Sequence, residues 1–237
     1  MDYINQNVSY WKQAVYDAPN PETFVFRSWS RVLKHDFNLT GENHETLLDF
    51  GCGPGGNTKY FHEKSFVVHG VDLSSIDIQR CKDRMPDAAD RFKVISPEAN
   101  RNDRWFGDIK FQLVTAFQSL YYYDDDDLEA RLMSIYDMMA PGGVIFATMV
   151  ASSCWWYNMS EPFKNGLRFV KFRRKTDEGR SGLTINDHYI NFVENSESLR
   201  NKFHMFKPCH SEGYYDGVYR DDQGSEKHLV FIGQKEA

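Results

Sequence analysis

The chain has 237 residues, of which 41% are hydrophobic and 15% aromatic, and its formal net charge is -6 at pH 7. This length suits one domain, and we expect a single domain over 1–237. The acidic balance and the absence of a broad basic stretch argue against a nucleic-acid partner. No run approaches the roughly 18 apolar residues that span a bilayer, and the first residues lack the features of a secretory signal. We therefore expect a cytoplasmic protein with no membrane partner.

The first 44 residues predict an N-terminal helical cap, and the next hundred predict the core of the fold. Helices are expected over 3–18 and 22–38, separated by Pro19-Asn20-Pro21, because proline disfavours helix in the residue before it. Over 45–150, short apolar runs alternate with helical patterns. The expected strands are 46–50, 66–71, 92–95, 111–117 and 144–149, and the expected helices are 56–64, 75–84 and 124–139. This alternation predicts an α/β fold with a Rossmann-like, doubly wound and mostly parallel sheet.

The last third of the chain departs from this alternation. Residues 151–192 are aromatic and irregular, apart from an extended stretch expected over 187–192, and we interpret them as a substrate cap. Residues 193–237 predict a C-terminal helix and strands that add an antiparallel edge strand to the sheet. These elements are expected over 196–203, 204–210 and 227–234, with a long surface connection over 211–226.

A glycine-rich loop is the most informative segment of the chain. Asp49-Phe50-Gly51-Cys52-Gly53-Pro54-Gly55-Gly56 follows an expected strand and opens an expected helix. At such a junction, backbone N–H groups and the helix dipole gather around a polar ligand. Glycines are needed there because a Cβ blocks the approach of the ligand or forbids the backbone angles of the turn.

Two kinds of ligand fit this loop. The spacing of Gly51, Gly53 and Gly56 satisfies the GxGxxG pattern of a dinucleotide site, and Asp72 at the end of the second strand suits ribose hydroxyls in either case. Asp49 distinguishes the two. A carboxylate at this position repels a pyrophosphate but suits the cationic amino end of S-adenosylmethionine.

Four segments resemble class I S-adenosylmethionine-dependent methyltransferases. They are the glycine-rich loop, Val71-Asp72-Leu73-Ser74, Phe111-Gln112-Leu113-Val114 through Ser119, and Met139-Ala140-Pro141-Gly142-Gly143. They occur in the order and at the spacing of that family, over roughly residues 46–150. The resemblance implies a methyltransferase that binds S-adenosylmethionine and releases S-adenosylhomocysteine.

The resemblance also implies roles for individual residues. The methionine part of the cofactor would be held by Asp49, Gly51, Gly53 and Gly55, and its methionine end would face Gln118 and Ser119. Asp72 would bind both ribose hydroxyls, and Leu73 would pack on the adenine. Glu98 is the candidate acceptor for the adenine amino group, although the family more often has Gly-Asp-Ala where this chain has Pro97-Glu98-Ala99. A helix-capping carboxylate is the alternative role for Glu98.

The run Asp124-Asp125-Asp126-Asp127 has two readings, a metal site or a helix start. Consecutive side chains point in different directions around a helix, so the four carboxylates do not converge on one ion. Acidic residues at a helix start act as an N-cap and complement the dipole. We therefore predict a helix cap here and no metal cofactor.

Candidate residues for contact with the methyl acceptor lie in the two expected caps, residues 1–44 and 151–192. Aromatic residues follow the fourth and fifth expected strands, at the rim where α/β folds bind ligands. The candidates are Tyr10, Arg27, Trp155 and Trp156, with packing or surface roles as the alternatives. His188 is the candidate general base, although a lone histidine is more often structural.

The expected activity is transfer of a methyl group from S-adenosylmethionine to an N or O atom of a small polar molecule. Phe117 to Tyr122, together with the stretch 152–156, resembles histamine N-methyltransferase and related small-molecule enzymes. Two alternatives remain open, an NAD(P)-dependent oxidoreductase and a non-catalytic S-adenosylmethionine-binding protein. The oligomeric state has no signature in the sequence.

Overall fold

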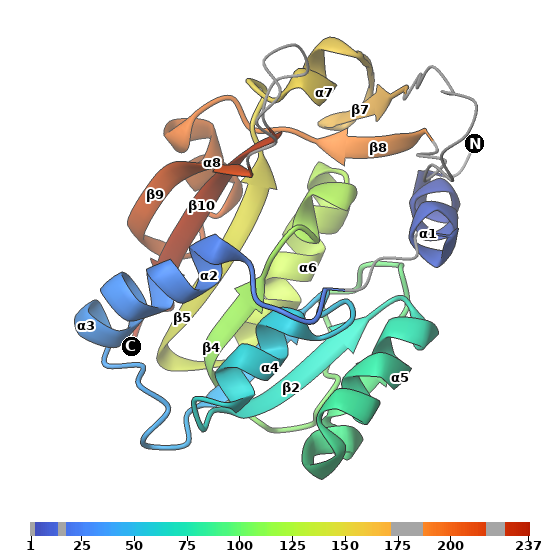
Figure 1. The fold of residues 1–237 in the computed structure, drawn as a ribbon. Helices are drawn as coiled ribbons and strands as arrows, with labels where there is room; N and C mark the ends of the chain where they lie inside the picture. The colour runs from blue at the N-terminus through green and yellow to red at the C-terminus, as the bar shows by residue number, and fades with distance from the viewer. Residues whose placement is uncertain (1–2, 14–17, 172–186, 217–225) are drawn as a thin grey trace.

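The structure is a computed structural model that describes residues 3–13, 18–171, 187–216 and 226–237. Its centre is a seven-stranded sheet with the strand order β3-β2-β1-β4-β5-β10-β9 (Figure 1). Strands β1 to β5 run parallel, whereas β10 and β9 join antiparallel at one edge. The bounds are β1 Thr46–Phe50, β2 Val67–Asp72, β3 Phe92–Val94, β4 Phe111–Ala116, β5 Met139–Val150, β9 Lys207–Asp216 and β10 Glu226–Gln234. The predicted Rossmann-like fold with an antiparallel C-terminal edge is confirmed.

Helices cover both faces of this sheet, which explains why its strands are almost continuously apolar. Leu47 in β1 packs in one core with α2, α4 and α5, and the next residue, Leu48, packs in a second core with α6 and α8. The helix bounds are α1 Tyr3–Gln13, α2 Thr23–Ser28, α3 Lys34–Asp36, α4 Gly56–His62, α5 Ser75–Arg84, α6 Asp125–Met138, α7 Trp155–Asn158 and α8 Ser196–Lys202. Short π- or 3₁₀-helical segments are η1 Trp29–Leu33, η2 Pro86–Arg91 and η3 Leu120–Tyr122.

A second, smaller sheet is formed by a segment that the sequence indicated to be irregular. Its antiparallel strands are β6 Ser160–Lys164, β7 Leu167–Val170 and β8 His188–Asn191. The extended stretch expected near 187–192 is β8. β6 and β7 carried no sequence signal because they are short and because β6 is polar, contains Pro162 and is mostly exposed.

The ends of several other elements also differ from expectation. The helix expected over 22–38 is α2, a π-helical turn and α3 in succession. β9 begins three residues later than predicted and continues into the segment expected to be a loop. Residues 14–17, at the end of the first expected helix, lie outside the described residues. Within the described ranges, no helix combines the length and apolarity of a membrane span.

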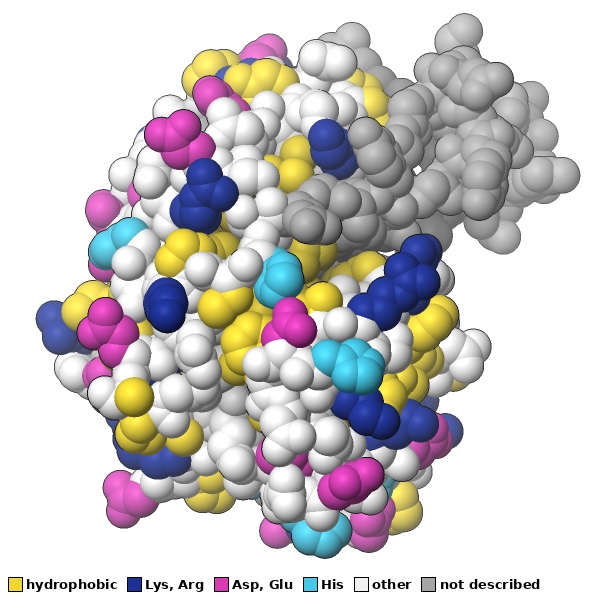
Figure 2. All heavy atoms as spheres, turned by 90° about the vertical axis from the view of Figure 1, so that its left-hand side faces the viewer, with side chains coloured by type: hydrophobic (Ala, Val, Ile, Leu, Met, Phe, Trp, Pro, Cys, Tyr) yellow, Lys and Arg dark blue, Asp and Glu magenta, His cyan; other side chains and the backbone are white. Residues whose placement is uncertain are grey.

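The second sheet and α1 stand over the carboxyl-terminal ends of the parallel strands (Figure 1). α1 packs beside β8, and the ring centroids of Tyr3 and Tyr189 are 6.2 Å apart. On the side of the molecule that carries β9 and α3, acidic and basic side chains are interspersed (Figure 2). The fold thus places a roof over the edge of the main sheet where α/β proteins bind ligands.

Candidate active site

A cavity of about 170 Å³ lies where the strand order reverses between β1 and β4. It is lined by the glycine-rich loop, the ends of β2 and β4, α1, and the linker between α1 and α2. In open α/β sheets such a reversal leaves a crevice between the loops that leave neighbouring strands in opposite directions. The cavity is therefore the candidate ligand site.

The glycine-rich loop supplies the floor of the cavity. Gly51, Gly53 and Gly55 have φ angles of +75°, +50° and +89°, which glycine adopts without strain. A Cβ on Gly53 would have no atom within 4 Å, so this residue opens onto free space, whereas a Cβ on Gly51 would collide with Ser119. Gly51 and Gly53 line the cavity. Gly55 instead packs on α5, where a Cβ would lie 2.8 Å from the Cys81 sulfur.

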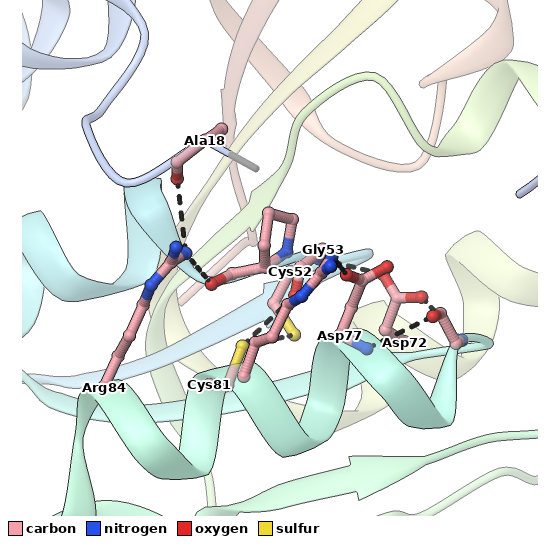
Figure 3. A network of polar contacts seen from close by, with 10 residues as sticks. Ala18, Cys52, Gly53, Asp72, Asp77, Cys81 and Arg84 are labelled. Atoms are coloured by element: carbon pink, nitrogen blue, oxygen red, sulfur yellow. Dashed lines mark hydrogen bonds and ion pairs between the residues drawn. The ribbon is translucent and has the colours of Figure 1, made fainter. Parts of the chain in front are cut away.

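Asp72 lies at the end of β2 with its carboxylate held in place. Its Oδ2 accepts a hydrogen bond from the Gly53 N–H at 2.9 Å, and its Oδ1 accepts one from the Ser74 N–H at 2.8 Å (Figure 3). Burial raises the pKa of Asp72, and these two bonds oppose the rise. Because a carboxylate has about four acceptor positions, both oxygens keep capacity for a ligand. Asp72 lines the cavity, as does its neighbour Leu73.

Asp49 lies beside the cavity but behind its wall. Its carboxylate is 2% exposed and accepts hydrogen bonds from the hydroxyls of Thr58 at 2.5 Å and Thr115 at 2.8 Å. Burial raises the pKa of Asp49 to about 6, although both hydroxyls lower it. Asp49 therefore contributes negative potential and a fixed loop, rather than an exposed surface, to this end of the cavity.

Gln118 and Ser119 line the cavity at the tip of β4. The φ angle of Gln118 is +52°, which is uncommon for a residue with a side chain and typical of functional sites. Its N–H donates to Thr148 Oγ1 at 2.8 Å, and the Ser119 hydroxyl donates to the Phe50 carbonyl at 2.9 Å. These bonds tie the tip of β4 to its two neighbours, β5 and β1.

Glu98 does not line the cavity, and its side chain is exposed. Its carbonyl oxygen accepts a hydrogen bond from the fully buried Arg131 at 2.9 Å, which fixes the backbone of this loop. Ile95 and Pro97 line the cavity at the same edge. Apolar side chains therefore form the cavity wall at the place where the sequence suggested a carboxylate. The role of Glu98 as acceptor for the adenine amino group stays a prediction.

Comparison with known proteins identifies the family. Residues 22–206 match the family model described as a methyltransferase domain. The chain belongs to this family. This membership agrees with the resemblance to class I S-adenosylmethionine-dependent methyltransferases.

Curated relatives match part of this methyltransferase. It is 33% identical over 148 residues to a malonyl-[acyl-carrier protein] O-methyltransferase of Salmonella typhimurium, covering 60% of this chain and 56% of that protein. It is 26% identical to a dTDP-3-amino-3,4,6-trideoxy-alpha-D-glucopyranose N,N-dimethyltransferase of Streptomyces venezuelae, covering 51% of this chain and 46% of that protein. The chain spans about half the length of the curated relatives it matches.

Solved structures share the fold of the methyltransferase over its whole length. The N-methyltransferase NodS of Bradyrhizobium japonicum, solved with S-adenosyl-L-homocysteine, aligns with a TM-score of 0.60 and 13% identity over 100% of both chains. An S-adenosylmethionine-dependent methyltransferase of Anabaena variabilis aligns with a TM-score of 0.64 and 12% identity, covering 100% of this chain and 96% of that one. At these identities the likeness shows the fold alone.

Helix α5 of the methyltransferase fastens the glycine-rich loop from below (Figure 3). The Cys81 thiol donates to the Gly53 carbonyl at 3.1 Å and lies 3.8 Å from the Cys52 sulfur. The hydrogen bond with Cys81 and burial raise the pKa of Cys52. Arg84 donates to the carbonyls of Pro54 and, at 3.4 Å, Ala18, so it joins the loop to the linker above it.

The linker over 18–22 is a part of the cavity wall that the sequence did not indicate. A Cβ on Gly56 would collide with the Ala18 carbonyl and lie 2.7 Å from the Asn20 carbonyl, so the linker rests directly on the start of α4. The Glu22 N–H donates to Asn57 Oδ1 at 2.9 Å. The glycine at position 56 was the only sequence signal, because a close backbone approach requires one.

Three of the four residues expected to contact an acceptor do not line the cavity. Arg27 is exposed on α2, and Trp155 and Trp156 on α7 are half-buried against the main core. The side chain of Tyr10 lies outside the described residues, although its backbone is in α1. Tyr122, Tyr123 and Phe117, from the end of β4 and the following turn, line the cavity instead.

His188, the candidate base, is 1% exposed on β8. Its ring centroid lies 6.1 Å from that of Tyr122 and 5.9 Å from that of Trp156. His188 does not line the cavity, whereas its neighbour Tyr122 does.

The run of four aspartates starts α6, as predicted. Asp124 is the N-cap and accepts a hydrogen bond from the Asp127 N–H at 3.0 Å. Asp127 accepts the Tyr3 hydroxyl, and Asp125 pairs with Lys202 at 2.6 Å. Within the described part of the chain, no three His, Cys, Asp or Glu side chains are arranged to hold a metal ion.

Proposed function

We propose that this methyltransferase transfers a methyl group from S-adenosylmethionine to an N or O atom of a small polar molecule. The observation that carries the proposal is the roof of the cavity: Ile4, Asn7 and Val8 of α1 line it from above the glycine-rich loop. A roofed cavity encloses a small molecule and excludes water, but leaves little room for a protein chain.

The residues at the cavity suit the cofactor. The Asp72 carboxylate would accept the ribose hydroxyls, and Leu73 and Ile95 would pack on the adenine. Gly51 and Gly53 would allow the methionine part to approach the backbone. Gln118 and Ser119 would face its far end, with Asp49 behind the wall favouring the cationic amino group. The free space at Gly53, which a Cβ would fill, is the observation that supports this placement.

The cofactor supplies a methyl group already activated on a sulfonium, so the protein need not provide a nucleophile. The task left to the chain is to orient the acceptor atom in line with the methyl group and to exclude water. Phe117, Tyr122 and Tyr123 would supply the walls of the acceptor side. An amine acceptor must arrive unprotonated, whereas a hydroxyl acceptor benefits from a general base, for which His188 remains the candidate.

The relatives include both acceptor chemistries. The Salmonella relative is named for an O-methylation of an acyl-carrier-bound malonyl group, and the Streptomyces relative for N-methylation of a nucleotide-linked amino sugar. The roof favours a free small molecule for this chain. A carrier protein would have to present its acyl group on a flexible arm that enters at the edge of the same roof. The acylated carrier protein is therefore the competing acceptor in the experiment.

Calorimetry and a transfer screen test this proposal. We expect micromolar or tighter binding of S-adenosylmethionine and S-adenosylhomocysteine and negligible binding of NAD(H), with transfer unaffected by EDTA. Methyl-labelled cofactor is then offered with small amines, small hydroxyl compounds and an acylated carrier protein. Preference for NAD(H) would indicate the oxidoreductase. Labelling of the carrier protein alone would refute a small acceptor, and binding without any transfer would favour a non-catalytic protein.

A further inference from the structure

One buried amide joins the roof of the cavity to the rest of the molecule. Asn7 of α1 is 5% exposed, and its Nδ2 donates to the carbonyls of Tyr122 at 3.2 Å and Tyr189 at 3.1 Å. Its Oδ1 accepts from the Tyr189 N–H at 2.8 Å. Both N–H donors and one of the two acceptor positions of the side chain are therefore in use. Asn7 also lines the cavity.

The three bonds of Asn7 join segments that are far apart in sequence. Tyr189 lies in β8 of the second sheet, and Tyr122 follows β4 of the main sheet, with its side chain on the cavity wall. Asn7 is therefore the point at which α1, the second sheet and the acceptor wall meet. The Asn7 side chain bonds to both the N–H and the carbonyl of Tyr189. Two such bonds to one residue fix the orientation of the side chain as well as its distance.

Other contacts of α1 reach the start of α6 and the second sheet. The Tyr3 hydroxyl donates to Asp127 at the start of α6, and the Lys164 amino group lies 5.1 Å above the Tyr3 ring. Gln6 Nε2 donates to the Asp187 carbonyl at 2.9 Å. The Tyr3 hydroxyl also accepts a hydrogen bond at 3.5 Å from the N–H of Asp124, two residues after Tyr122. These contacts reach the second sheet and the end of the segment that carries Tyr122, whereas Asn7 bonds to Tyr122 itself.

We propose that Asn7 is a positioning residue for methyl transfer. It holds Ile4 and Val8, which lie on the same face of α1 at helical spacing, over the cavity, and it fixes Tyr122 at the acceptor wall. This inference rests on the proposed function. The groups that would hold the cofactor belong to the glycine-rich loop, the ends of β2 and β4, and Ile95. Asn7 is not among them and bonds to Tyr122 of the acceptor wall, so its role concerns the acceptor side.

Three variants separate this role from a contribution to stability alone. Asn7→Ala removes all three bonds and leaves the Tyr189 N–H and two carbonyls without these partners. Asn7→Asp keeps an acceptor for the Tyr189 N–H and loses both donors. Asn5→Ala is the matched control, because Asn5 is exposed on the same helix.

The readouts are kcat and KM for the acceptor found in the screen, affinity for S-adenosylhomocysteine, and amide hydrogen exchange of residues 3–13 in the ligand-bound protein. For Asn7→Ala we expect kcat/KM to fall by about tenfold or more, exchange in α1 to rise, and cofactor affinity to change less than about threefold, since one lost interaction corresponds to roughly a factor of ten. Asn7→Asp should be intermediate, and Asn5→Ala, at an exposed position, should change each of these readouts much less than Asn7→Ala.

Two results would overturn the inference. One is a kcat/KM and an α1 exchange rate for Asn7→Ala that match those of Asn5→Ala. The other is an equal loss of cofactor affinity and kcat/KM, which would mark Asn7 as a general structural residue. If Asn7→Ala does not fold, the inference is tested by comparing kcat/KM, cofactor affinity and α1 exchange between Asn7→Asp and Asn5→Ala. The exchange experiment needs no acceptor, so it tests the anchoring of α1 by Asn7 even where the proposed small-molecule activity fails.

Discussion

Two acidic residues on adjacent strands have different roles because their side chains differ in direction and surroundings. Asp72 ends β2 and faces the cavity, held by two backbone N–H groups. Asp49 precedes the last residue of β1 and points toward α4, where the Thr58 hydroxyl meets it. The first is placed to touch a ligand, and the second to shape the potential behind the loop.

Replacing Asp72 tests the ribose contact. Asp72→Asn keeps the size of the side chain but loses the charge and one acceptor oxygen, and hydrogen bonds to a charged group contribute about 1.5–3 kcal/mol. We expect affinity for S-adenosylhomocysteine, measured by calorimetry, to weaken by roughly tenfold or more. Asp83→Asn, an exposed change on neighbouring α5, is the control. Equal affinities of the two variants would exclude Asp72 from the cofactor site.

The raised pKa of Asp49 predicts a pH dependence of stability. Its value is about 6 in the folded protein against 3.8 in a free chain, so between these values the folded state holds a proton that the unfolded state has lost. The contribution of Asp49 to the free energy of unfolding is therefore greatest below pH 4. It declines by about 3 kcal/mol as the pH rises to 6 and is constant above that.

Urea unfolding of the wild type and Asp49→Asn at pH 4.0 to 7.5 measures this contribution. The free energy of unfolding of the wild type, minus that of Asp49→Asn, should fall as the pH rises from 4 to 6. A difference that does not vary with pH would show that Asp49 titrates alike in the folded and unfolded chain.

At the scale of elements, the start of α6 shows how the main sheet and the roof are joined. Asp124 caps the helix, Asp127 accepts the Tyr3 hydroxyl from α1, and Asp125 accepts from Asn191 of β8 at 2.8 Å. The acidic run thus also anchors α1 and the second sheet. One helix terminus connects three elements that are far apart in the sequence.

Removal of the Asp124 cap should lower the free energy of unfolding and should not make the protein dependent on a metal ion. Asp124→Ala leaves the Asp127 N–H unsatisfied and should lower the free energy of unfolding by about 1 kcal/mol, the usual cost of a lost N-cap. Asp126→Ala is the control, since Asp126 is exposed in the same turn. Thermal or urea unfolding measures both. If the two variants are equally stable, Asp124 does not cap α6 in solution.

At the scale of the whole molecule, the cavity is assembled from segments that lie more than one hundred residues apart. α1 and the linker over 18–22 supply the roof and one wall, and the loops after β1, β2 and β4 supply the floor and the remaining walls. A ligand that fills the cavity touches all of these segments together. It should therefore stabilise them as one unit.

Hydrogen exchange with and without S-adenosylhomocysteine tests this assembly. We expect slower exchange in residues 18–22 and in the glycine-rich loop on binding, with a smaller effect in α1. α8, which lies away from the cavity, serves as the internal control. Protection confined to the glycine-rich loop would mean that the linker over 18–22 does not close on the ligand.

The sequence by itself determined the core fold and the cofactor class. β1, α5 and the glycine-rich loop were predicted correctly because their signals are local: an apolar strand, a capped helix and a turn that requires glycine. The carboxylate of Asp72 was found for the same reason, since its distance from the loop is set by one strand, one helix and one turn. Local backbone preferences and short-range spacing carry this information in any protein of the class.

Only the tertiary structure decided the acceptor side. Asn7 and Tyr189 meet across 182 positions of sequence, and Asn7 carries no motif that would indicate the pairing. Trp155 and Trp156 follow a strand at the expected rim, yet they pack on the core, while Tyr122 takes the cavity wall. Which aromatic residue faces the ligand depends on how α1 and the second sheet pack together. That packing arises from long-range burial and hydrogen bonding, which short-range sequence patterns do not specify.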